Sequence, residues 1–274
     1  MDQPAWSEAF TPDRLTPIRA LALPEPITAD WAWGGATGAG VKVAVVDSGV
    51  DGSHPYVKGI AGGVALEYDP DAPGSVRFDD SPHDDLFGHG TACAGLIRAL
   101  APDCELFSVR VLGRKLSGKG LVLAAGIRWA IDNHMNVVNL SLSTKSAELF
   151  GPLHELVDEA YFRGVLLVSA VNNSPMPSYP SLYSSVISVA ARSNDGPQTF
   201  AYNPEPPVEF GAPGFDVDVA WLDGAVITAT GNSFAAPVVA GYVARTLSKH
   251  PGLTPFQVKT ILHAVADNVA TPDP

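Results

Sequence analysis

Short apolar runs rich in β-branched residues alternate along the chain with longer helix-like segments, and this alternation limits the fold more than any other feature. The runs with strand character occupy residues 41–46, 105–111, 137–142, 165–170 and 186–191. Segments with helical character occupy residues 89–99, 121–134, 153–163, 234–250 and 255–266. Strands that alternate with helices at this spacing form a parallel sheet covered on both faces. We therefore predict a three-layer α/β/α protein with a central, mostly parallel sheet.

The composition fits one large globular domain and argues against two classes of partner. Of the 274 residues, 46% are hydrophobic and 17% are charged, and the formal net charge is -12. This charge repels nucleic-acid phosphates and anionic lipid surfaces. A neutral or basic polypeptide is an acceptable partner, so we expect no nucleic-acid and no membrane binding. The sequence does not indicate an oligomeric state.

Three features favour a cytoplasmic protein. Residues 1–8 contain neither the basic nor the apolar stretch of a signal peptide. No apolar run is long enough to span a bilayer. Cys93 and Cys104, the two cysteines, are too few for a disulfide framework of the kind that secreted domains use.

An acidic, turn-rich segment at residues 67–85 predicts a surface loop. Asp69, Asp71, Asp79 and Asp80 are hard oxygen ligands of the kind that calcium prefers. Their spacing, however, matches no calcium motif. We therefore expect a solvated loop and no metal or other cofactor, with a calcium site as the alternative.

Three short motifs supply the residue types of a nucleophilic site. Asp47 ends the first predicted strand in Val-Val-Asp-Ser-Gly, and His89 begins a predicted helix in Gly-His-Gly-Thr-Ala-Cys. Ser233 precedes a helix in Gly-Asn-Ser-Phe-Ala-Ala-Pro. Each motif alone has a simpler explanation, as a turn former, a loop histidine or a helix N-cap. Together they combine a hydroxyl with the base it needs to act as a nucleophile.

With these motifs in the order Asp, His, Ser, the chain resembles the subtilisin-like serine proteases over about residues 28–266. The resemblance implies a subtilisin-like fold. It also implies that Ser233 is the nucleophile, that His89 is its general base and that Asp47 orients the imidazole.

The family also uses an asparagine amide to stabilise the oxyanion. Val-Asn-Asn follows the predicted strand at 165–170, where the family has Gly-Asn. By this register Asn173 is the oxyanion donor and Asn172 replaces the glycine. The alternative is that both asparagines only form a turn.

The resemblance implies that a polypeptide substrate binds as an added β-strand. Three segments would contact it: Ser117, Gly118 and Lys119; Ser141, Leu142 and Ser143; and Ala170, Val171 and Asn172. Ordinary loop and strand-end roles are the alternative. Ser143, Thr144 and Asn172 stand where glycines are usual in the family, which predicts a narrower and more polar specificity pocket.

The chain also differs from many members of the family in other features, the first of which is its N-terminal segment. Residues 1–26 are rich in proline, and we predict that they form an arm ahead of a peptidase domain at 27–274. Intracellular members of the family carry such an arm, which lies across the site and inhibits it; a simple tail is the alternative.

The segment after the His89 helix is too short for the calcium loop of many members. Asn232 replaces the usual threonine, and Val238 a common histidine.

These inferences predict an intracellular serine endopeptidase of restricted specificity that works through an acyl-enzyme. A pseudoprotease that binds peptides without cutting them is one alternative, against which the presence of all four catalytic groups argues. A transpeptidase or macrocyclase is another, against which the lack of an obvious helical insertion argues. Cys93 lies one helical turn after His89, so its sulfur is expected close behind the triad.

Overall fold

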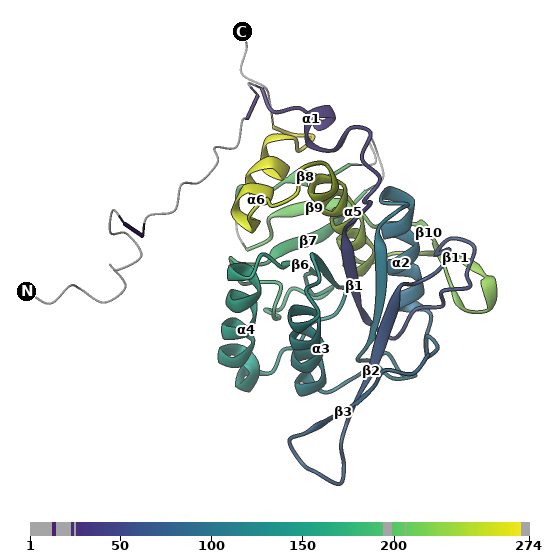
Figure 1. Cartoon of the computed structure of the whole chain (residues 1–274). Coiled ribbons are helices and arrows are strands. Elements are labelled where there is room, and N and C mark those ends of the chain that lie inside the picture. Colours follow the sequence, from purple (N-terminus) through teal and green to yellow (C-terminus); the bar gives the residue numbers. More distant parts are fainter. Residues whose placement is uncertain (1–12, 15–22, 25, 194–198, 206, 270–274) are drawn as a thin grey trace, which may run out of the picture.

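The computed structural model describes residues 13–14, 23–24, 26–193, 199–205 and 207–269 (Figure 1). The predicted N-terminal arm at residues 1–26 lies almost entirely outside these described residues. The division into an arm and a peptidase domain therefore stays a prediction.

A single large sheet organises the described part of the chain. Its strands are β1 (Lys42–Asp47), β2 (Gly62–Tyr68), β3 (Val76–Asp79), β4 (Glu105–Arg110), β5 (Val137–Leu140), β6 (Leu166–Ala170), β7 (Ile187–Arg192), β8 (Ala201–Tyr202) and β9 (Phe210–Pro213). They are ordered β3-β2-β4-β1-β5-β6-β7-β9-β8. Only the outermost pairs, β2 with β3 and β8 with β9, are antiparallel. The predicted mostly parallel sheet is confirmed.

Helices cover both faces of this sheet. They are α1 (Ala29–Trp33), α2 (His89–Leu100), α3 (Gly120–Asp132), α4 (Phe150–Phe162), α5 (Asn232–Lys249) and α6 (Pro255–Ala264). Short 3₁₀ turns, η2 (Ala147–Leu149) and η3 (Leu222–Gly224), and a two-stranded ribbon of β10 (Val217–Ala220) and β11 (Val226–Ala229) complete the fold.

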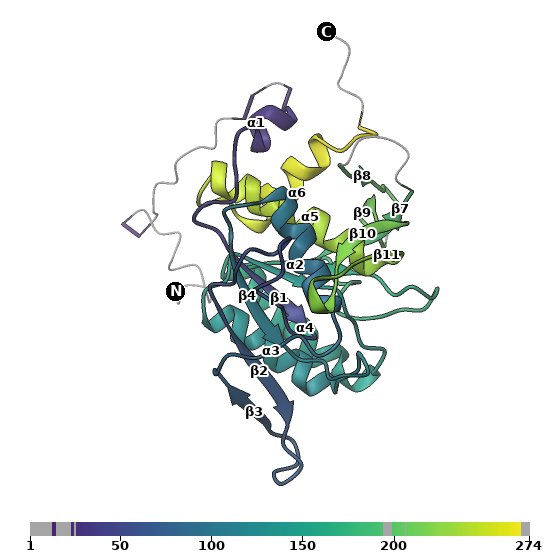
Figure 2. The same ribbon diagram turned by 90° about the vertical axis from the view of Figure 1, so that its right-hand side faces the viewer.

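Alternate residues of β1 show how the layers are held. Val43 and Val45 belong to a buried cluster with residues of α2 and α5, whereas Ala44 and Val46 belong to one with residues of α3 and α4. Because successive side chains of a strand point to opposite faces, one strand anchors both helical layers. Figure 2 shows α2 and α5 on one side of β1 and β4, and α3 on the other. Searched over the described residues, the helices include none with the length and apolarity of a bilayer span.

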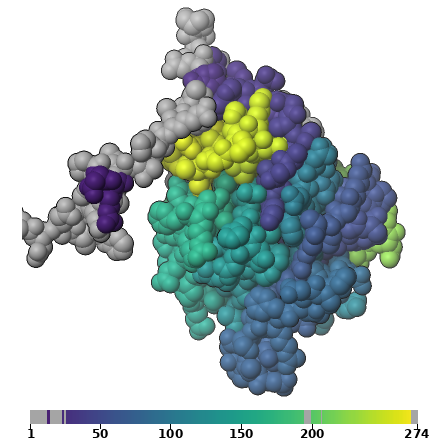
Figure 3. All heavy atoms as spheres, viewed as in Figure 1, coloured from purple at the N-terminus to yellow at the C-terminus, as the bar shows by residue number. Residues whose placement is uncertain are grey.

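The acidic segment at 67–85 is not simply a loop, and that prediction is wrong for its first part. β2 and β3 form an antiparallel hairpin in which Ala65 stands opposite Asp79. This hairpin protrudes from the body of the molecule (Figure 3). Arg77 donates hydrogen bonds of 2.6 Å to both Asp69 and Asp71. The chain's own guanidinium thus pairs with two of the four carboxylates that suggested calcium.

Two element boundaries shift at the site. α5 begins at Asn232 and not at residue 234, so Ser233 lies inside the first turn of the helix. The predicted strand at 137–142 ends at Leu140, which leaves the next residues free to form a loop at the sheet edge. Helix α1 and strand β2 were not predicted.

Candidate active site

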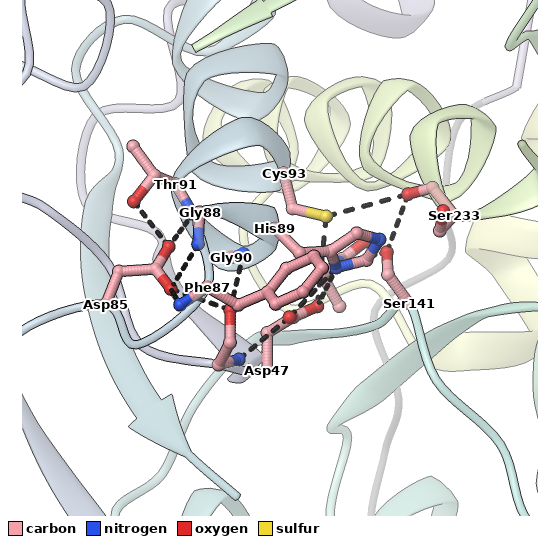
Figure 4. A network of polar contacts seen from close by, with 12 residues as sticks. Asp47, Asp85, Phe87, Gly88, His89, Gly90, Thr91, Cys93, Ser141 and Ser233 are labelled. Carbon is pink, nitrogen blue, oxygen red and sulfur yellow. Dashed lines mark hydrogen bonds and ion pairs between the residues drawn. The ribbon is translucent and has the colours of Figure 1, made fainter. Parts of the chain in front are cut away.

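A buried carboxylate–imidazole pair lies at the carboxyl end of β1 (Figure 4). The Nδ1 atom of His89 lies 2.9 Å from both carboxylate oxygens of Asp47, and the two residues are 6% and 0% exposed. The backbone N–H of Ser48 donates to Oδ1 of Asp47 at 2.8 Å, which helps to fix the carboxylate. An ionised carboxylate only accepts hydrogen bonds, so the proton is on Nδ1 and Nε2 is left as the basic nitrogen.

The same pair sets the basicity of the imidazole. Burial alone lowers the pKa of His89, because it disfavours the charged ring. The negative charge and hydrogen bond of Asp47 oppose this effect and outweigh it, so the pKa of His89 lies well above 6.5. His89 is therefore a stronger base than a free histidine.

Two glycines allow the histidine helix to approach the aspartate strand. A Cβ atom on Gly90 would lie 2.0 Å from the carbonyl oxygen of Gly49 and 3.1 Å from the Cβ of Asp47. Gly49 itself has φ of 109°, a left-handed conformation that other residues rarely adopt. Close packing therefore requires a glycine at position 90, and the backbone conformation favours one at position 49.

Ser233 is anchored beside this pair by its backbone. Its carbonyl oxygen lacks the usual helical partner, because the residue four positions later is Pro237, which has no N–H. The hydroxyl of Ser141 donates to that oxygen at 2.8 Å, and the thiol of Cys93 lies 3.6 Å from it (Figure 4). The first turn of α5 is thus tied to the end of β5 and to the helix that carries His89.

Phe234, the residue after Ser233, contacts the imidazole of His89. The ring of Phe234 lies 5.4 Å from that of His89, measured between centroids. Within the described residues, the hydroxyl of Ser233 makes no hydrogen bond to His89. Such bonds are often long in enzymes without substrate and tighten when substrate binds.

Asn173 lies near the start of α5, the helix that carries Ser233. The backbone N–H of Asn232 donates to Oδ1 of Asn173 at 3.0 Å, which fixes the orientation of the amide. A Cβ atom built on Gly231 would lie 3.3 Å from the Ser233 hydroxyl and 3.7 Å from the Asn173 Nδ2. The hydroxyl of Ser233 and the amide nitrogen of Asn173 therefore both lie close to Gly231.

The side chain of Asn232 has a role that the sequence did not suggest. Its Nδ2 donates to the carbonyl oxygens of Val171 and Asn172 at 3.2 and 3.1 Å, and its Oδ1 accepts from the N–H of Ala191 at 2.8 Å. It thereby joins the residues before Asn173 to β7 and α5. The sequence marked Asn232 only as a replacement for threonine.

The predicted substrate-contacting residues do not all gather in one place. A cavity of about 310 Å³ brings together Ser117, Gly118, Lys119, Ser141, Leu142 and Ser143. The third predicted segment does not line it. Ala170 is buried in β6, and the carbonyl groups of Val171 and Asn172 are held by Asn232.

One cluster among the described residues has the spacing of metal ligands. It consists of Asp47, His89 and Cys93, whose ligand atoms lie within 4.8 Å of one another. Burial raises the pKa of the Cys93 thiol, although His89 opposes the effect, so burial favours the protonated thiol over the thiolate. The Asp47–His89 hydrogen bonds already account for the other two groups.

A parallel sheet with a buried Asp–His pair at its carboxyl edge, and a serine in the adjoining helix turn, has the layout of a Ser–His–Asp hydrolase. Comparison with known sequences identifies the family within this class of hydrolases. Residues 38–273 match the Subtilase family, and the chain belongs to that family.

Known relatives are similar over most of this chain. It is 34% identical over 249 residues to the thermostable alkaline protease of Halalkalibacterium halodurans, covering 87% of this chain and 65% of the relative. It is 34% identical to subtilisin E of Bacillus subtilis, covering 85% of this chain and 62% of the relative. The chain thus spans a little under two thirds of the length of these relatives.

A solved structure agrees with the sequence comparisons. A cold-adapted subtilisin-like serine proteinase superposes with a TM-score of 0.68 at 28% identity, covering 84% of this chain and 83% of the other. The predicted subtilisin-like fold is confirmed.

Proposed function

We propose that this chain is a serine endopeptidase that hydrolyses peptide bonds of polypeptides through an acyl-enzyme intermediate. The observation that carries the proposal is the buried Asp47–His89 pair, in which Nδ1 of His89 lies within hydrogen-bond distance, 2.9 Å, of both carboxylate oxygens. This pair lies beside the first turn of α5, which holds Ser233. Membership of the Subtilase family supports it.

Each group has a defined task in this proposal. Nε2 of His89 takes the proton of Ser233 as Oγ attacks the scissile carbonyl, and a C–O bond forms. Asp47 stabilises the resulting imidazolium. The same proton then passes to the amine as the C–N bond breaks. Water, activated by His89, afterwards hydrolyses the acyl-enzyme.

The oxyanion would be stabilised from two directions. Nδ2 of Asn173 donates to it, with its amide oriented by the N–H of Asn232. Ser233 lies in the first turn of α5, where free N–H groups and the positive end of the helix dipole favour negative charge. Removal of a single such donor typically lowers turnover by about 100- to 1000-fold.

We further propose that the peptidase cleaves a restricted range of substrates and that it acts in the cytoplasm. Side chains at Ser143, Thr144 and Asn172, in place of the family's glycines, support the first part. A cytoplasmic location stays a prediction; one relative, 35% identical to this chain, is named minor extracellular protease Epr of Bacillus subtilis.

A fluorophosphonate probe tests the activity directly. The wild-type chain should be labelled on Ser233, and Ser233→Ala should be neither labelled nor active. A folded wild type that does not react would point to a pseudoprotease. Mass spectrometry of the products from a long peptide distinguishes hydrolysis from cyclisation, and a cyclic product would favour a macrocyclase.

A further inference from the structure

Asp85 is a buried carboxylate four residues before His89, in the segment that the sequence marked as a surface loop. It is 5% exposed, and its two oxygens accept five hydrogen bonds. A carboxylate this far from water is stable only if hydrogen bonds replace its lost hydration. The number of donors shows that the surrounding backbone is organised around it.

Most of these donors belong to the start of the histidine helix. Oδ1 accepts from the N–H groups of Phe87 and Gly88 at 2.9 and 2.8 Å. Oδ2 accepts from the N–H of Thr91 at 2.9 Å and from its hydroxyl at 2.6 Å. Gly88, the N-cap residue of α2, has no side chain to cap the helix, so Asp85 does so from outside. His89 lies between residues that Asp85 holds on both sides (Figure 4).

The remaining donor belongs to the aspartate strand. The hydroxyl of Ser48, the residue after Asp47, donates to Oδ1 of Asp85 at 2.7 Å. The same hydroxyl accepts from the N–H of Gly90 at 3.1 Å. The hydroxyl of Thr91 similarly accepts from the N–H of Asp51 at 2.9 Å. Asp85 is thus the shared acceptor of a network that joins the turn after β1 to the first turn of α2.

We propose that Asp85 is a positioning residue, which holds the imidazole of His89 where its Nδ1 can hydrogen-bond to the carboxylate of Asp47. It touches neither the imidazole nor the site of the reacting bond, so it acts through the backbone on each side of both residues. The proposal rests on the proposed function for its effect on catalysis, but its geometric part can be tested without any activity.

A purely structural cap would stabilise the protein without changing His89, so the test must measure His89 itself. Two titratable groups face the imidazole: Asp47 from β1 and Cys93 from α2, whereas α5 presents the uncharged Ser233 and Phe234. If Asp85 fixes the position of the His89 imidazole relative to the Asp47 carboxylate, the loss of Asp85 should weaken the hydrogen bond between them. The pKa of His89 should then fall towards 6.5.

The test is an NMR titration of His89 in the full chain, in Asp85→Asn and in Asp84→Asn. Asp84 is exposed and adjacent, and its variant removes the same charge without touching the network. We expect Asp85→Asn to lower the pKa of His89 clearly more than Asp84→Asn does. A folded Asp85→Asn with the same His89 pKa as Asp84→Asn would overturn the proposal.

A milder variant decides the case if Asp85→Asn does not fold. Thr91→Val keeps the side-chain shape and the net charge but removes two bonds of the network. It should lower the pKa of His89 in the same direction by a smaller amount. An unchanged pKa in Thr91→Val would then contradict the positioning role.

Kinetics provide the second readout. Because small misplacements of a catalytic group are costly, Asp85→Asn should lower kcat/KM by about 10- to 100-fold, mainly through kcat. Asp84→Asn should stay close to wild type. If the wild type neither cleaves peptides nor reacts with a fluorophosphonate, the proposed function fails, while the titration still decides the role of Asp85.

Discussion

The hydroxyl of Ser141 donates a 2.8 Å hydrogen bond to the carbonyl oxygen of Ser233. This bond replaces a helical one that cannot form, because Pro237 stands where the N–H donor would be. Ser141 was predicted to contact substrate, and that contact stays a prediction. Its hydroxyl also has a structural role: Ser141 is 8% exposed, and the hydroxyl accepts a further hydrogen bond from Asn139 at 3.0 Å.

Replacing Ser141 by alanine should therefore destabilise the protein more than an ordinary surface change. The carbonyl of Ser233 would keep only the weak thiol contact of Cys93, and a buried acceptor that loses its donor costs about 1 to 3 kcal/mol. Chemical denaturation should show this loss in the free energy of unfolding. Ser143→Ala, at a partly exposed serine two residues away, is the control and should change stability little. Equal stabilities for the two variants would argue against this role.

Asn173→Ala should lower kcat by about 100-fold or more with little change in KM, because the amide acts mainly in the transition state. Steady-state kinetics on one peptide substrate measure both constants. A change confined to KM would show that Asn173 binds substrate and does not stabilise the oxyanion.

Asn232 should act through Asn173, since its side chain holds the carbonyls of Val171 and Asn172 just before that residue. Asn232→Ala should lower kcat in the wild type but have much less effect in Asn173→Ala. A double-mutant cycle measures this coupling. Fully additive effects would mean that Asn232 contributes independently of the oxyanion donor.

The sequence predicted the parallel sheet and the positions of Asp47 and His89, because both depend on local patterns. Apolar runs set the strands, and glycines mark the close contact between β1 and α2. Asp85 was missed because an aspartate in an acidic segment looks the same whether it is solvated or buried. Only the fold shows that one of its donors, Ser48, lies 37 positions before it, whereas the others are its neighbours.

The paired hairpin and the Asn232 contacts were missed for a related reason. β3 pairs with β2 across a turn within a segment whose charges outweigh any strand pattern. The partners of Asn232 lie 41 to 61 residues away in sequence. Hydrogen bonds over such separations follow from the tertiary fold and leave no periodic signal in the chain.

The pH dependence of activity should reflect the raised pKa of His89. The general base must be neutral, so kcat/KM should rise with pH through this pKa, with a midpoint above 6.5. Protonation of His89 in the folded state also stabilises the fold. That contribution is complete below the unfolded pKa of about 6.5 and is lost as pH rises through the folded value. A pH–rate profile with its acidic limb at or below 6.5 would contradict the Asp47–His89 pairing.

Mercurial reagents should inhibit the enzyme through Cys93. Its sulfur lies 3.9 Å from Oδ2 of Asp47 and 3.6 Å from the carbonyl oxygen of Ser233, so a bound metal atom would disturb both. Cys104 offers a matched control, since it is also buried and unpaired, and burial raises its pKa to about 11. Cys93→Ala should resist inhibition, and Cys104→Ala should remain sensitive. Equal sensitivity of Cys93→Ala and wild type would exclude this mechanism.

The specificity pocket should favour small residues just before the cleaved bond. β5 and β6 are parallel neighbours with Leu140 opposite Ser169, so both strands end at the same edge of the sheet. The segments that follow them carry Thr144 and Asn172, and each of these side chains accepts a hydrogen bond from its own loop, from the N–H of Ser146 and Ser174 respectively.

These bonds satisfy the polar groups of Thr144 and Asn172, so the expected restriction comes from side-chain volume more than from polarity. A misfit of methylene size in a pocket costs about 1 to 3 kcal/mol, or roughly 10- to 200-fold in kcat/KM. A matched series of chromogenic tetrapeptides that differ only at this residue should therefore rank Ala and Ser above Leu, Tyr and Phe. Asn172→Gly should raise kcat/KM for the Phe peptide relative to the Ala peptide. The narrow-pocket prediction is wrong if the wild type prefers the Phe or Leu peptide by tenfold or more, or if Asn172→Gly leaves the ratio unchanged.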